Sequence, residues 1–216
     1  MVTVCWSPKG GSGTTVVATA LALVLAARHD GALLVDLAGD VPAVLGLAEP
    51  GGPGALDWLA SPDAGADALG RLIQPSDGGL DVVVAGESPP GGRWPVGRAA
   101  ALVDALAAER RPVVVDAGVW RPGLHDAVAR ATASLMVIRP CYLALRRAVA
   151  APVRPSGIVL VQEPGRSLGR ADVEDILGVP VVACVQLSPD VARAVDAGLL
   201  VSRLPRSLSR GLRAAA

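Results

Sequence analysis

The stretch W-S-P-K-G-G-S-G-T-T-V, residues 6–16, holds most of the residues of a phosphate-binding loop. A P-loop has the pattern G-x-x-x-x-G-K-[ST], in which glycines let successive backbone N–H groups turn toward the phosphates. Gly13 and Thr15 occupy their places in this pattern, but Thr14 stands where the lysine belongs. The one lysine of the chain, Lys9, lies five residues before that place.

The segments on either side of the loop have the order that a phosphate site requires. An apolar strand-like run, Val2–Trp6, precedes the loop, and an apolar helix-like segment, Thr14–Ala27, follows it. The N-terminus of such a helix adds partial positive charge to the inward-facing N–H groups. We therefore expect a bound phosphate to contact the following residues: Lys9, Gly10, Gly11, Ser12, Gly13, Thr14 and Thr15.

Acidic residues end two of the later apolar runs. Asp36 ends Ala32–Asp36, and Asp116 ends Pro112–Asp116. An acid that ends a strand near a P-loop holds Mg²⁺ through water, and the Ser/Thr of the loop also meets that ion. The sequence thus predicts a magnesium site at Thr15 and Asp116, with Asp36 close to the nucleotide.

The apolar runs recur along the chain and alternate with helix-like segments rich in Ala, Leu and Arg. They are apolar throughout, which is typical of strands buried on both faces of a parallel sheet. The pattern predicts an α/β fold with a doubly wound, mostly parallel sheet and helices on both faces, as in P-loop NTPases. The predicted strands are Val2–Trp6, Ala32–Asp36, Leu80–Ala85, Pro112–Asp116, Ser134–Arg139, Gly157–Gln162 and Val179–Val185. The later predicted helices are Val96–Arg110, Leu124–Ala131, Tyr142–Ala151, Arg170–Leu177 and Asp190–Ala197.

Two segments interrupt this rhythm with proline and glycine. In Gly46–Gly79 we expect short helices and loops over the sheet edge, anchored by Leu56, Trp58 and Leu59. Glu87–Pro95 is predicted to be a loop. Neither segment has the character of a domain linker, because a strand-like run follows soon after it.

Several stretches together resemble the deviant Walker-A family of ParA and MinD ATPases. They are K-G-G-S-G-T-T (9–15), L-L-V-D-L-A-G-D (33–40) and V-V-V-D-A-G (113–118), in the order and spacing of that family. The stretch 177–200 resembles the family's later strand, nucleotide-base loop and helix. The stretch 36–47 is similar to the pilus-assembly branch of CpaE and TadZ-like proteins. The resemblance covers nearly the whole chain and implies binding of ATP or ADP with Mg²⁺.

The resemblance also implies roles for single residues. In the family, an early lysine reaches across a sandwich dimer to the partner's nucleotide, and Lys9 takes that position. The loop lysine that reaches the β- and γ-phosphates is Thr14 here. The second acid of the family's D-x-D motif, which positions the attacking water, is Ala38 here, and Asp40 lies two residues out of register. Because phosphoryl transfer relies on positioned charge, these departures predict little or no hydrolysis, with Lys9 and Asp40 as the candidate catalytic groups.

The expectation from sequence is a homodimeric positioning switch or scaffold with an unknown protein partner. It would serve chromosome or plasmid partitioning, division-site placement or pilus positioning. One alternative is a Rossmann-type oxidoreductase, since Gly11–Val16 begins like G-x-G-x-x-G and Asp36 could bind a ribose. That alternative lacks the third glycine, which is Val16, and leaves Lys9 unexplained. Another alternative is an interaction module of the same fold that needs no nucleotide.

Composition limits the class of protein further. The chain has 216 residues, of which 51% are hydrophobic, so one sizeable core and a single domain over 1–216 are expected. The formal net charge is zero, which does not indicate a DNA-binding protein. The N-terminal segment lacks the basic leader of a signal peptide, and Thr14–Ala27 is too short to span a membrane. A cytoplasmic location is expected, with Cys5, Cys141 and Cys184 as reduced thiols.

For four further side chains, a structural role is favoured over a role in binding or catalysis. His29 and His125 lack the spacing of metal ligands and should lie on the surface. Trp6 and Trp120 follow predicted strand ends close to the loop, where they could line a site, but packing is the favoured role.

The last segment, Leu199–Ala216, has two interpretations. Its arginines have no acidic neighbours, and Leu204, Leu208 and Leu212 would form one apolar stripe on a helix after Pro205. Such a helix could lie on the inner face of a membrane. Docking of the helix on the sheet is favoured, because the apolar face is narrow and lacks Trp and Phe.

Overall fold

The computed structural model describes residues 1–48, 51–89 and 93–216. Its centre is a sheet of eight strands in the order β3-β4-β2-β5-β1-β6-β7-β8. All neighbouring pairs are parallel except β3 with β4. The strands are β1 (Val2–Ser7), β2 (Ala32–Asp36), β3 (Gln74–Pro75), β4 (Leu80–Val83), β5 (Val113–Val119), β6 (Ala133–Ile138), β7 (Gly157–Gln162) and β8 (Val181–Gln186).

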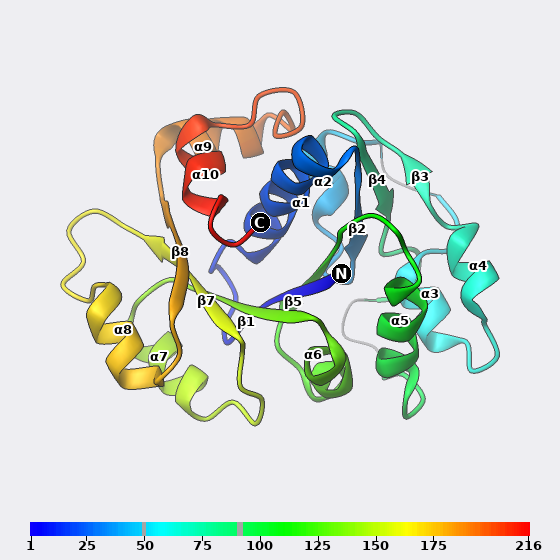
Figure 1. Ribbon diagram of the computed structural model, residues 1–216, viewed down its shortest axis with the longest axis horizontal. Coiled ribbons are helices and arrows are strands. Elements are labelled where there is room, and N and C mark those ends of the chain that lie inside the picture. The colour runs from blue at the N-terminus through cyan, green and yellow to red at the C-terminus, as the bar shows by residue number, and fades with distance from the viewer. Residues whose placement is uncertain (49–50, 90–92) are drawn as a thin grey trace.

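Helices cover both faces of the sheet (Figure 1). One face carries α1 (Thr14–His29), α2 (Val41–Leu45), α9 (Pro189–Asp196) and α10 (Arg206–Leu212). The other face carries α3 (Ala55–Ala60), α4 (Ala66–Gly70), α5 (Arg98–Ala107), the 3₁₀ turn η1 (Pro122–Leu124), α6 (His125–Arg130), α7 (Tyr142–Val149) and α8 (Arg170–Leu177). The doubly wound fold class predicted from the apolar runs is confirmed.

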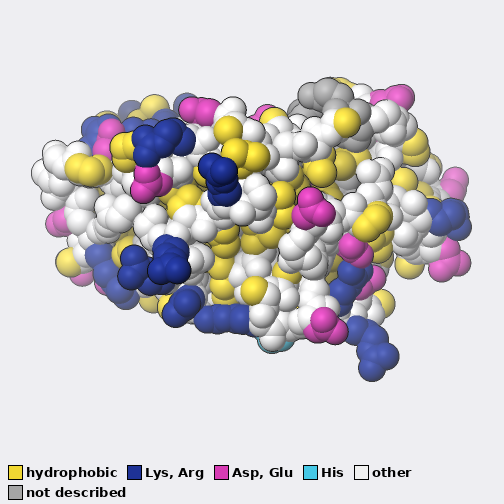
Figure 2. Space-filling view, turned by 90° about the horizontal axis from the view of Figure 1, so that it is seen from above, with side chains coloured by type: hydrophobic (Ala, Val, Ile, Leu, Met, Phe, Trp, Pro, Cys, Tyr) yellow, Lys and Arg dark blue, Asp and Glu magenta, His cyan; other side chains and the backbone are white. Residues whose placement is uncertain are grey.

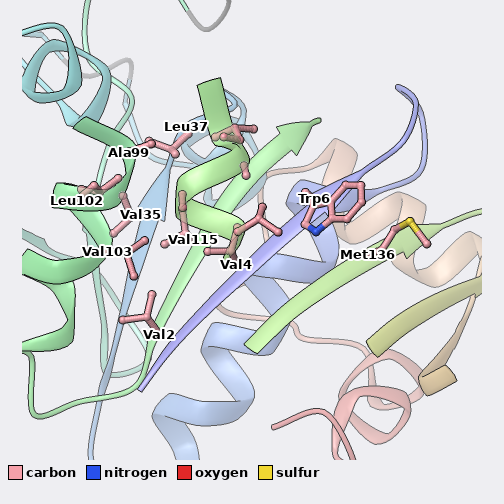
Figure 3. Packing of buried hydrophobic residues seen from close by; sticks show 14 of the residues in the cluster. Val2, Val4, Trp6, Val35, Leu37, Ala99, Leu102, Val103, Val115 and Met136 are labelled. Atoms are coloured by element: carbon pink, nitrogen blue, oxygen red, sulfur yellow. The ribbon is translucent and has the colours of Figure 1, made fainter. Parts of the chain in front are cut away.

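The side chains of β1 show how the two cores arise. Val2, Val4 and Trp6 point toward the α5 side of the sheet, and Cys5 points into the α1 side. Figure 3 shows Val2 and Val4 beside residues of β2, β5 and α5. Trp6 is fully buried and its Nε1 donates a hydrogen bond to Ser134 Oγ over 2.9 Å, so its role is packing, as favoured from sequence.

All seven strands predicted from apolar runs are present, with shifted ends. The largest shift is in β5, which continues to Val119, so Asp116 lies inside the strand rather than at its end. Ser7 of β1 pairs with Val119, which keeps the strand going past the acid. β3 and α2 were not predicted, because β3 has only two exposed residues and α2 is too short to show a helical period.

The described part of the proline- and glycine-rich segment Gly46–Gly79 contains the short helices α3 and α4 and strand β3. Leu56, Trp58 and Leu59 are buried, as predicted. Arg98 of α5 holds the segment in place: its Nη2 donates to Trp58 O at 2.8 Å, and its guanidinium lies 3.8 Å from the Trp58 ring centroid. The predicted loop Glu87–Pro95 includes residues 90–92, which lie outside the described residues.

The C-terminal segment docks on the sheet through α10, which begins directly after Pro205 as predicted. Leu208 and Leu212 are buried against the α1 side of the sheet, and Leu204 packs beside them. Arg28 Nη1 of α1 donates to the carbonyl oxygens of Arg213 and Ala216, both over 3.1 Å. The docked interpretation is therefore the one that the structure shows.

The arginines of this segment face outward. An open hollow of about 500 Å³ lies on the surface of α9 and α10. It is lined by three of these arginines, Arg203, Arg206 and Arg210, and by Arg193 of α9. In Figure 2, most of the dark blue side chains, those of Lys and Arg, lie in the left half of the view. Within the described ranges, the helices are all too short or too polar to span a bilayer.

Candidate phosphate-binding site

The loop between β1 and α1 has the backbone of a phosphate cradle. Gly11 and Gly13 have φ angles of 75° and 83°, which side chains with a Cβ rarely adopt. Ser12 Oγ donates to Lys9 O over 2.9 Å and Ser7 Oγ donates to the same oxygen over 3.1 Å. These bonds fix the conformation of the loop. Helix α1 begins at Thr14, and its N-cap residue, Gly13, has no side chain to accept hydrogen bonds from the first N–H groups of the helix.

A cavity of about 730 Å³ opens in front of this loop. It lies at the carboxyl ends of the central strands, where ligands bind in open α/β sheets. Its volume is in the range of sites for small molecules and cofactors. It is lined by Ser7, Gly10, Gly11, Ser12, Gly13, Thr14, Thr15, Val16, Ala38, Asp40, Ala43, Val44, Gly118, Val119, Arg121, Val195 and Asp196.

A smaller apolar pocket of about 140 Å³ adjoins the cavity. The two share Gly13, Val16, Val195 and Asp196. The pocket also takes in Leu187, which lies in the stretch expected from sequence to form the base loop. Together the two spaces offer a polar glycine cradle beside an apolar slot.

Asp36 is fully buried, and its carboxylate is occupied by its own turn. Oδ1 accepts hydrogen bonds from the N–H groups of Ala38 (2.8 Å) and Gly39 (2.7 Å), and Oδ2 accepts one from Val41 (3.1 Å). Burial raises the pKa of Asp36, while these three N–H groups act in the opposite direction. Asp36, like Asp116, is not among the residues that line the cavity. Asp36 thus shapes the segment that carries Ala38 and Asp40, and its place close to a nucleotide stays a prediction.

Asp116 is also fully buried, but its carboxylate is only half satisfied. Oδ1 accepts a hydrogen bond from the N–H of Gly118 over 3.0 Å, and Oδ2 has no partner among the described residues. Burial, reinforced by the charges of Asp36 and Asp40, raises the pKa of Asp116 to about 7, while the nearby Thr15 hydroxyl and Gly118 N–H act in the opposite direction. A buried oxygen without a donor beside the loop threonine fits a water of a hydrated Mg²⁺ ion.

The oxygen donors of Thr15 and Asp116 suit magnesium rather than a metal ion that is coordinated by protein side chains alone. The described residues contain no cluster of three His, Cys, Asp or Glu side chains that could hold a metal ion. Mg²⁺ keeps several waters and binds through one or two protein oxygens together with substrate phosphates. Thr15 and Asp116 can supply that protein share.

The other predicted site residues lie as follows. Thr14 is buried and lines the cavity. Ala38 and the exposed Asp40 also line it. Lys9 does not line the cavity, and its Nζ donates to Gly10 O over 2.9 Å on the outer limb of the loop. The loop thus presents its backbone to the cavity and its single lysine elsewhere.

Sequence reasoning missed several residues of the cavity wall, among them two charged ones, Asp196 and Arg121. Arg121 lies two residues beyond β5 and is the only basic side chain among those that line the cavity. Its Nη2 donates to Leu37 O over 3.1 Å, and its guanidinium lies 4.9 Å from the centroid of the Trp94 ring. The sequence signal was its place just after D-A-G-V-W (116–120), at the carboxyl end of β5, where ligands bind in such sheets.

The remaining sequence expectations concern side chains outside the cavity. His29 and His125 are exposed, as predicted. Trp120 does not line the cavity and packs against the α5-side core, so packing is its role. Cys5 is buried, whereas Cys141 and Cys184 are half-buried, and all three are free thiols.

Comparison of sequences places the chain beside mycobacterial proteins. It is 33% identical over 217 residues to Uncharacterized protein MT3760 and to Uncharacterized protein Rv3660c, from two strains of Mycobacterium tuberculosis. The alignment covers 80% of this chain, and the chain spans 60% of the length of these curated relatives. No protein-family model matches the sequence.

Comparison of structures identifies the fold. A ParA family ATPase from Chlorobium tepidum superimposes with a TM-score of 0.78 at 20% identity, covering 98% of this chain and 95% of that one. The fold is that of the ParA and MinD ATPases. The MinC:MinD complex of Aquifex aeolicus gives a TM-score of 0.78 at 20% identity (98% and 92% covered), and MinD of Pyrococcus horikoshii complexed with Mg-ADP gives 0.76 at 17% (97% and 91%).

Proposed function

We propose that residues 1–216 form one ParA/MinD-like domain that binds ATP or ADP with Mg²⁺ and acts as a dimeric positioning switch or scaffold. The observation that carries the proposal is the pairing of a glycine cradle with a buried carboxylate oxygen that lacks a partner. Gly10–Thr15 line the cavity, and Asp116 Oδ2 is the oxygen that has no hydrogen bond among the described residues. A hydrated divalent cation held between phosphates, Thr15 and Asp116 would satisfy it.

The two adjoining spaces suit the two ends of a nucleotide. The N–H groups of Gly10–Thr15 and the N-terminus of the 16-residue helix α1 favour a polyphosphate. The apolar pocket around Val16, Leu187 and Val195 favours the flat face of a base. MinD of Pyrococcus horikoshii, which shares the fold, was solved with Mg-ADP. These features favour a nucleoside polyphosphate over the dinucleotide of an oxidoreductase.

Hydrolysis is proposed to be weak or absent. Thr14 cannot neutralise charge that develops between the β- and γ-phosphates, and Ala38 cannot orient an attacking water. Asp40 lies on the cavity wall and is exposed, while Lys9 bonds to its own loop. Asp40 and Lys9 are the candidates for a residual catalytic role.

Homodimerisation is the second part of the proposal. Lys9 lies on the rim of the phosphate loop and outside its own cavity, which is where a residue that serves a partner's nucleotide would lie. Light scattering with and without Mg-ATP tests this, with Lys9→Ala as the variant and Arg147→Ala, exposed on α7, as the control. Nucleotide should promote dimers in wild type and in the control but not in Lys9→Ala. Monomers throughout would contradict dimerisation.

The cargo of such a switch is proposed by fold likeness alone. Partitioning of chromosomes or plasmids, division-site placement and pilus positioning, the last in CpaE and TadZ-like proteins, all fit a switch of this shape. A protein partner is expected, and zero net charge does not favour DNA. A cytoplasmic location is proposed, and any contact with the inner face of a membrane would involve the outward arginines of 199–216.

Thermal unfolding distinguishes the proposed function from its alternatives. A ligand present at 100 times its Kd stabilises the native state by about 2.7 kcal/mol. Mg-ADP and Mg-ATP should raise the melting temperature, and NADH should not. In Gly11→Val, which forces a β-branched residue to a φ of 75°, the shift with nucleotide should vanish. A shift with NADH alone would favour the oxidoreductase, and no shift with any ligand would favour the nucleotide-independent module.

A further inference from the structure

The phosphate loop directs no cation into the cavity in front of it, yet the wall of that cavity carries one. Thr14 replaces the loop lysine, and Lys9 does not line the cavity. Of the lining residues, Asp40 and Asp196 are acidic and Arg121 alone is basic. A polyphosphate in this cavity would therefore meet its positive charge at Arg121.

The backbone at Arg121 is tied to the root of the phosphate loop. The N–H of Trp120 donates to Ser7 O over 2.8 Å, and Ser7 Oγ lies 3.3 Å from Gly118 O, a second acceptor for its one hydroxyl proton. Ser7 also anchors the loop through Lys9 O. The chain just before Arg121 thus has a fixed position relative to the cradle, which a phosphate-binding side chain needs.

The guanidinium is partly desolvated and incompletely paired. It has five N–H donors, of which one, on Nη2, bonds to Leu37 O. Nε is buried without a partner, and the described residues offer Arg121 no ion pair within 4.0 Å. Burial lowers the pKa of Arg121, with the charge of Asp116 acting in the opposite direction. A desolvated cation without a carboxylate partner is costly unless an anion joins it.

Contacts on two sides keep the guanidinium at the cavity wall. The Trp94 ring lies 4.9 Å from its central carbon, and Leu37 O accepts from Nη2. Arginine presents a planar fork that can bind phosphate through two parallel N–H groups while one face stays on an aromatic ring. This arrangement leaves donors free for an anion in the cavity.

We propose that Arg121 binds the phosphate chain of a nucleoside di- or triphosphate and replaces the loop lysine that Thr14 lacks. The inference rests on the proposed function, because it assigns a residue to the same site. It names Arg121 as a binding residue and gives it no part in proton transfer.

The test is calorimetric titration of Mg-ADP into four proteins: wild type, Arg121→Gln, Thr14→Lys and the double variant. Arg121→Gln should weaken binding about 10- to 100-fold, the size of a charged hydrogen bond. Thr14→Lys in the Arg121→Gln background should restore most of that loss, since it returns a cation to the same phosphates. In wild type, Thr14→Lys should add less than it restores in the variant, because one cation is already present.

Controls separate charge from structure. Arg121→Lys keeps the charge and should lose much less affinity than Arg121→Gln, and Arg147→Gln, exposed on α7, should bind like wild type. Equal binding by wild type and Arg121→Gln would overturn the inference and leave the proposed function standing. A loss in Arg121→Gln that neither lysine recovers would assign Arg121 to packing and also overturn it. Failure of wild type to bind Mg-ADP would reject the proposed function itself.

Discussion

Asp36 and Asp116 are register partners on the neighbouring parallel strands β2 and β5, and both are fully buried. Their carboxylates nevertheless differ in kind. Asp36 accepts three backbone N–H bonds within its own turn, whereas one oxygen of Asp116 has no hydrogen bond within the part of the chain that the structure describes. The first acid builds the site, and the second is left for a ligand.

Replacing each acid by its amide should therefore affect stability differently: Asp36→Asn should lower the free energy of unfolding and Asp116→Asn should not. Asp36→Asn puts an NH₂ group against a backbone N–H, which leaves buried donors unpaired at a cost of about 1–3 kcal/mol. Asp116→Asn removes a buried charge whose pKa is raised to about 7, so at pH 8 it should leave the free energy of unfolding unchanged or higher. Urea unfolding of both variants at pH 8 measures this. An Asp116→Asn protein as unstable as Asp36→Asn would show that the orphan oxygen is structurally required.

Stability in acid should depend on Asp57. Although burial acts to raise its pKa, the Ser88 hydroxyl and the N–H groups of Gly54, Glu87 and Ser88 lower the pKa of Asp57 overall. A lowered pKa means that this stabilisation is complete above the unfolded pKa of about 4 and is lost as the pH falls below it. Asp57→Asn should be less stable than wild type at pH 7, with the difference shrinking toward pH 3.

The matched control for Asp57 is Asp175→Asn, an exposed acid on α8. Chemical denaturation from pH 7 to pH 3 should give parallel curves for the control and wild type. A constant gap between Asp57→Asn and wild type over that range would show that its carboxylate bonds are not the source of the pH dependence.

Hydrolysis should be restored only by two changes together. Thr14→Lys alone should tighten nucleotide binding with little turnover, because no group orients water. Ala38→Asp returns the acid of the D-x-D motif and should raise the rate clearly only in the double variant. The effects should not add, since both groups act on one transition state. Phosphate release at matched protein concentration is the measurement, and robust turnover by wild type would contradict the account and point to Lys9 and Asp40.

The C-terminal helix should depend on its leucines and not on its arginines. Leu208 is buried on the sheet, and burying a leucine contributes about 1.5–3 kcal/mol. Leu208→Asp should lower the melting temperature markedly, while Arg210→Ser, at an exposed arginine that forms no described ion pair, should change it little. Liposome sedimentation of both variants is the second readout. If Leu208→Asp kept full stability and lost liposome binding, the helix would be a membrane element.

The fold was predictable because its signals are local. Seven of the eight strands are continuous apolar runs, and the glycines at 10, 11 and 13 mark the loop without reference to any distant residue. The docked leucines of α10 follow from their spacing of four. β3 escaped prediction because its two exposed residues, Gln74 and Pro75, leave no apolar signal, and it lies at the edge of the sheet, where it pairs with β4.

The sequence predicted the main segments of the site but not the different roles of its individual residues. The sequence places acids at Asp36 and Asp116 alike, and only the turn after β2 decides that one of them is consumed by backbone N–H groups. Arg121 was missed because its partners, Leu37 O and Trp94, lie 84 and 27 positions away in the chain (121 − 37 and 121 − 94). Contacts at such separation have no signature in a local pattern.

The central claim is that the loop and Asp116 hold a magnesium nucleotide, and calorimetry with and without Mg²⁺ tests it most directly. Wild type should bind one ADP or ATP per chain with Mg²⁺ and bind it more weakly in EDTA. Asp116→Asn should bind with the weaker affinity in both conditions, because the residue that receives the hydrated ion is gone. Absence of heat from ATP, ADP and GTP in Mg²⁺, from a protein that still unfolds cooperatively, would contradict the account.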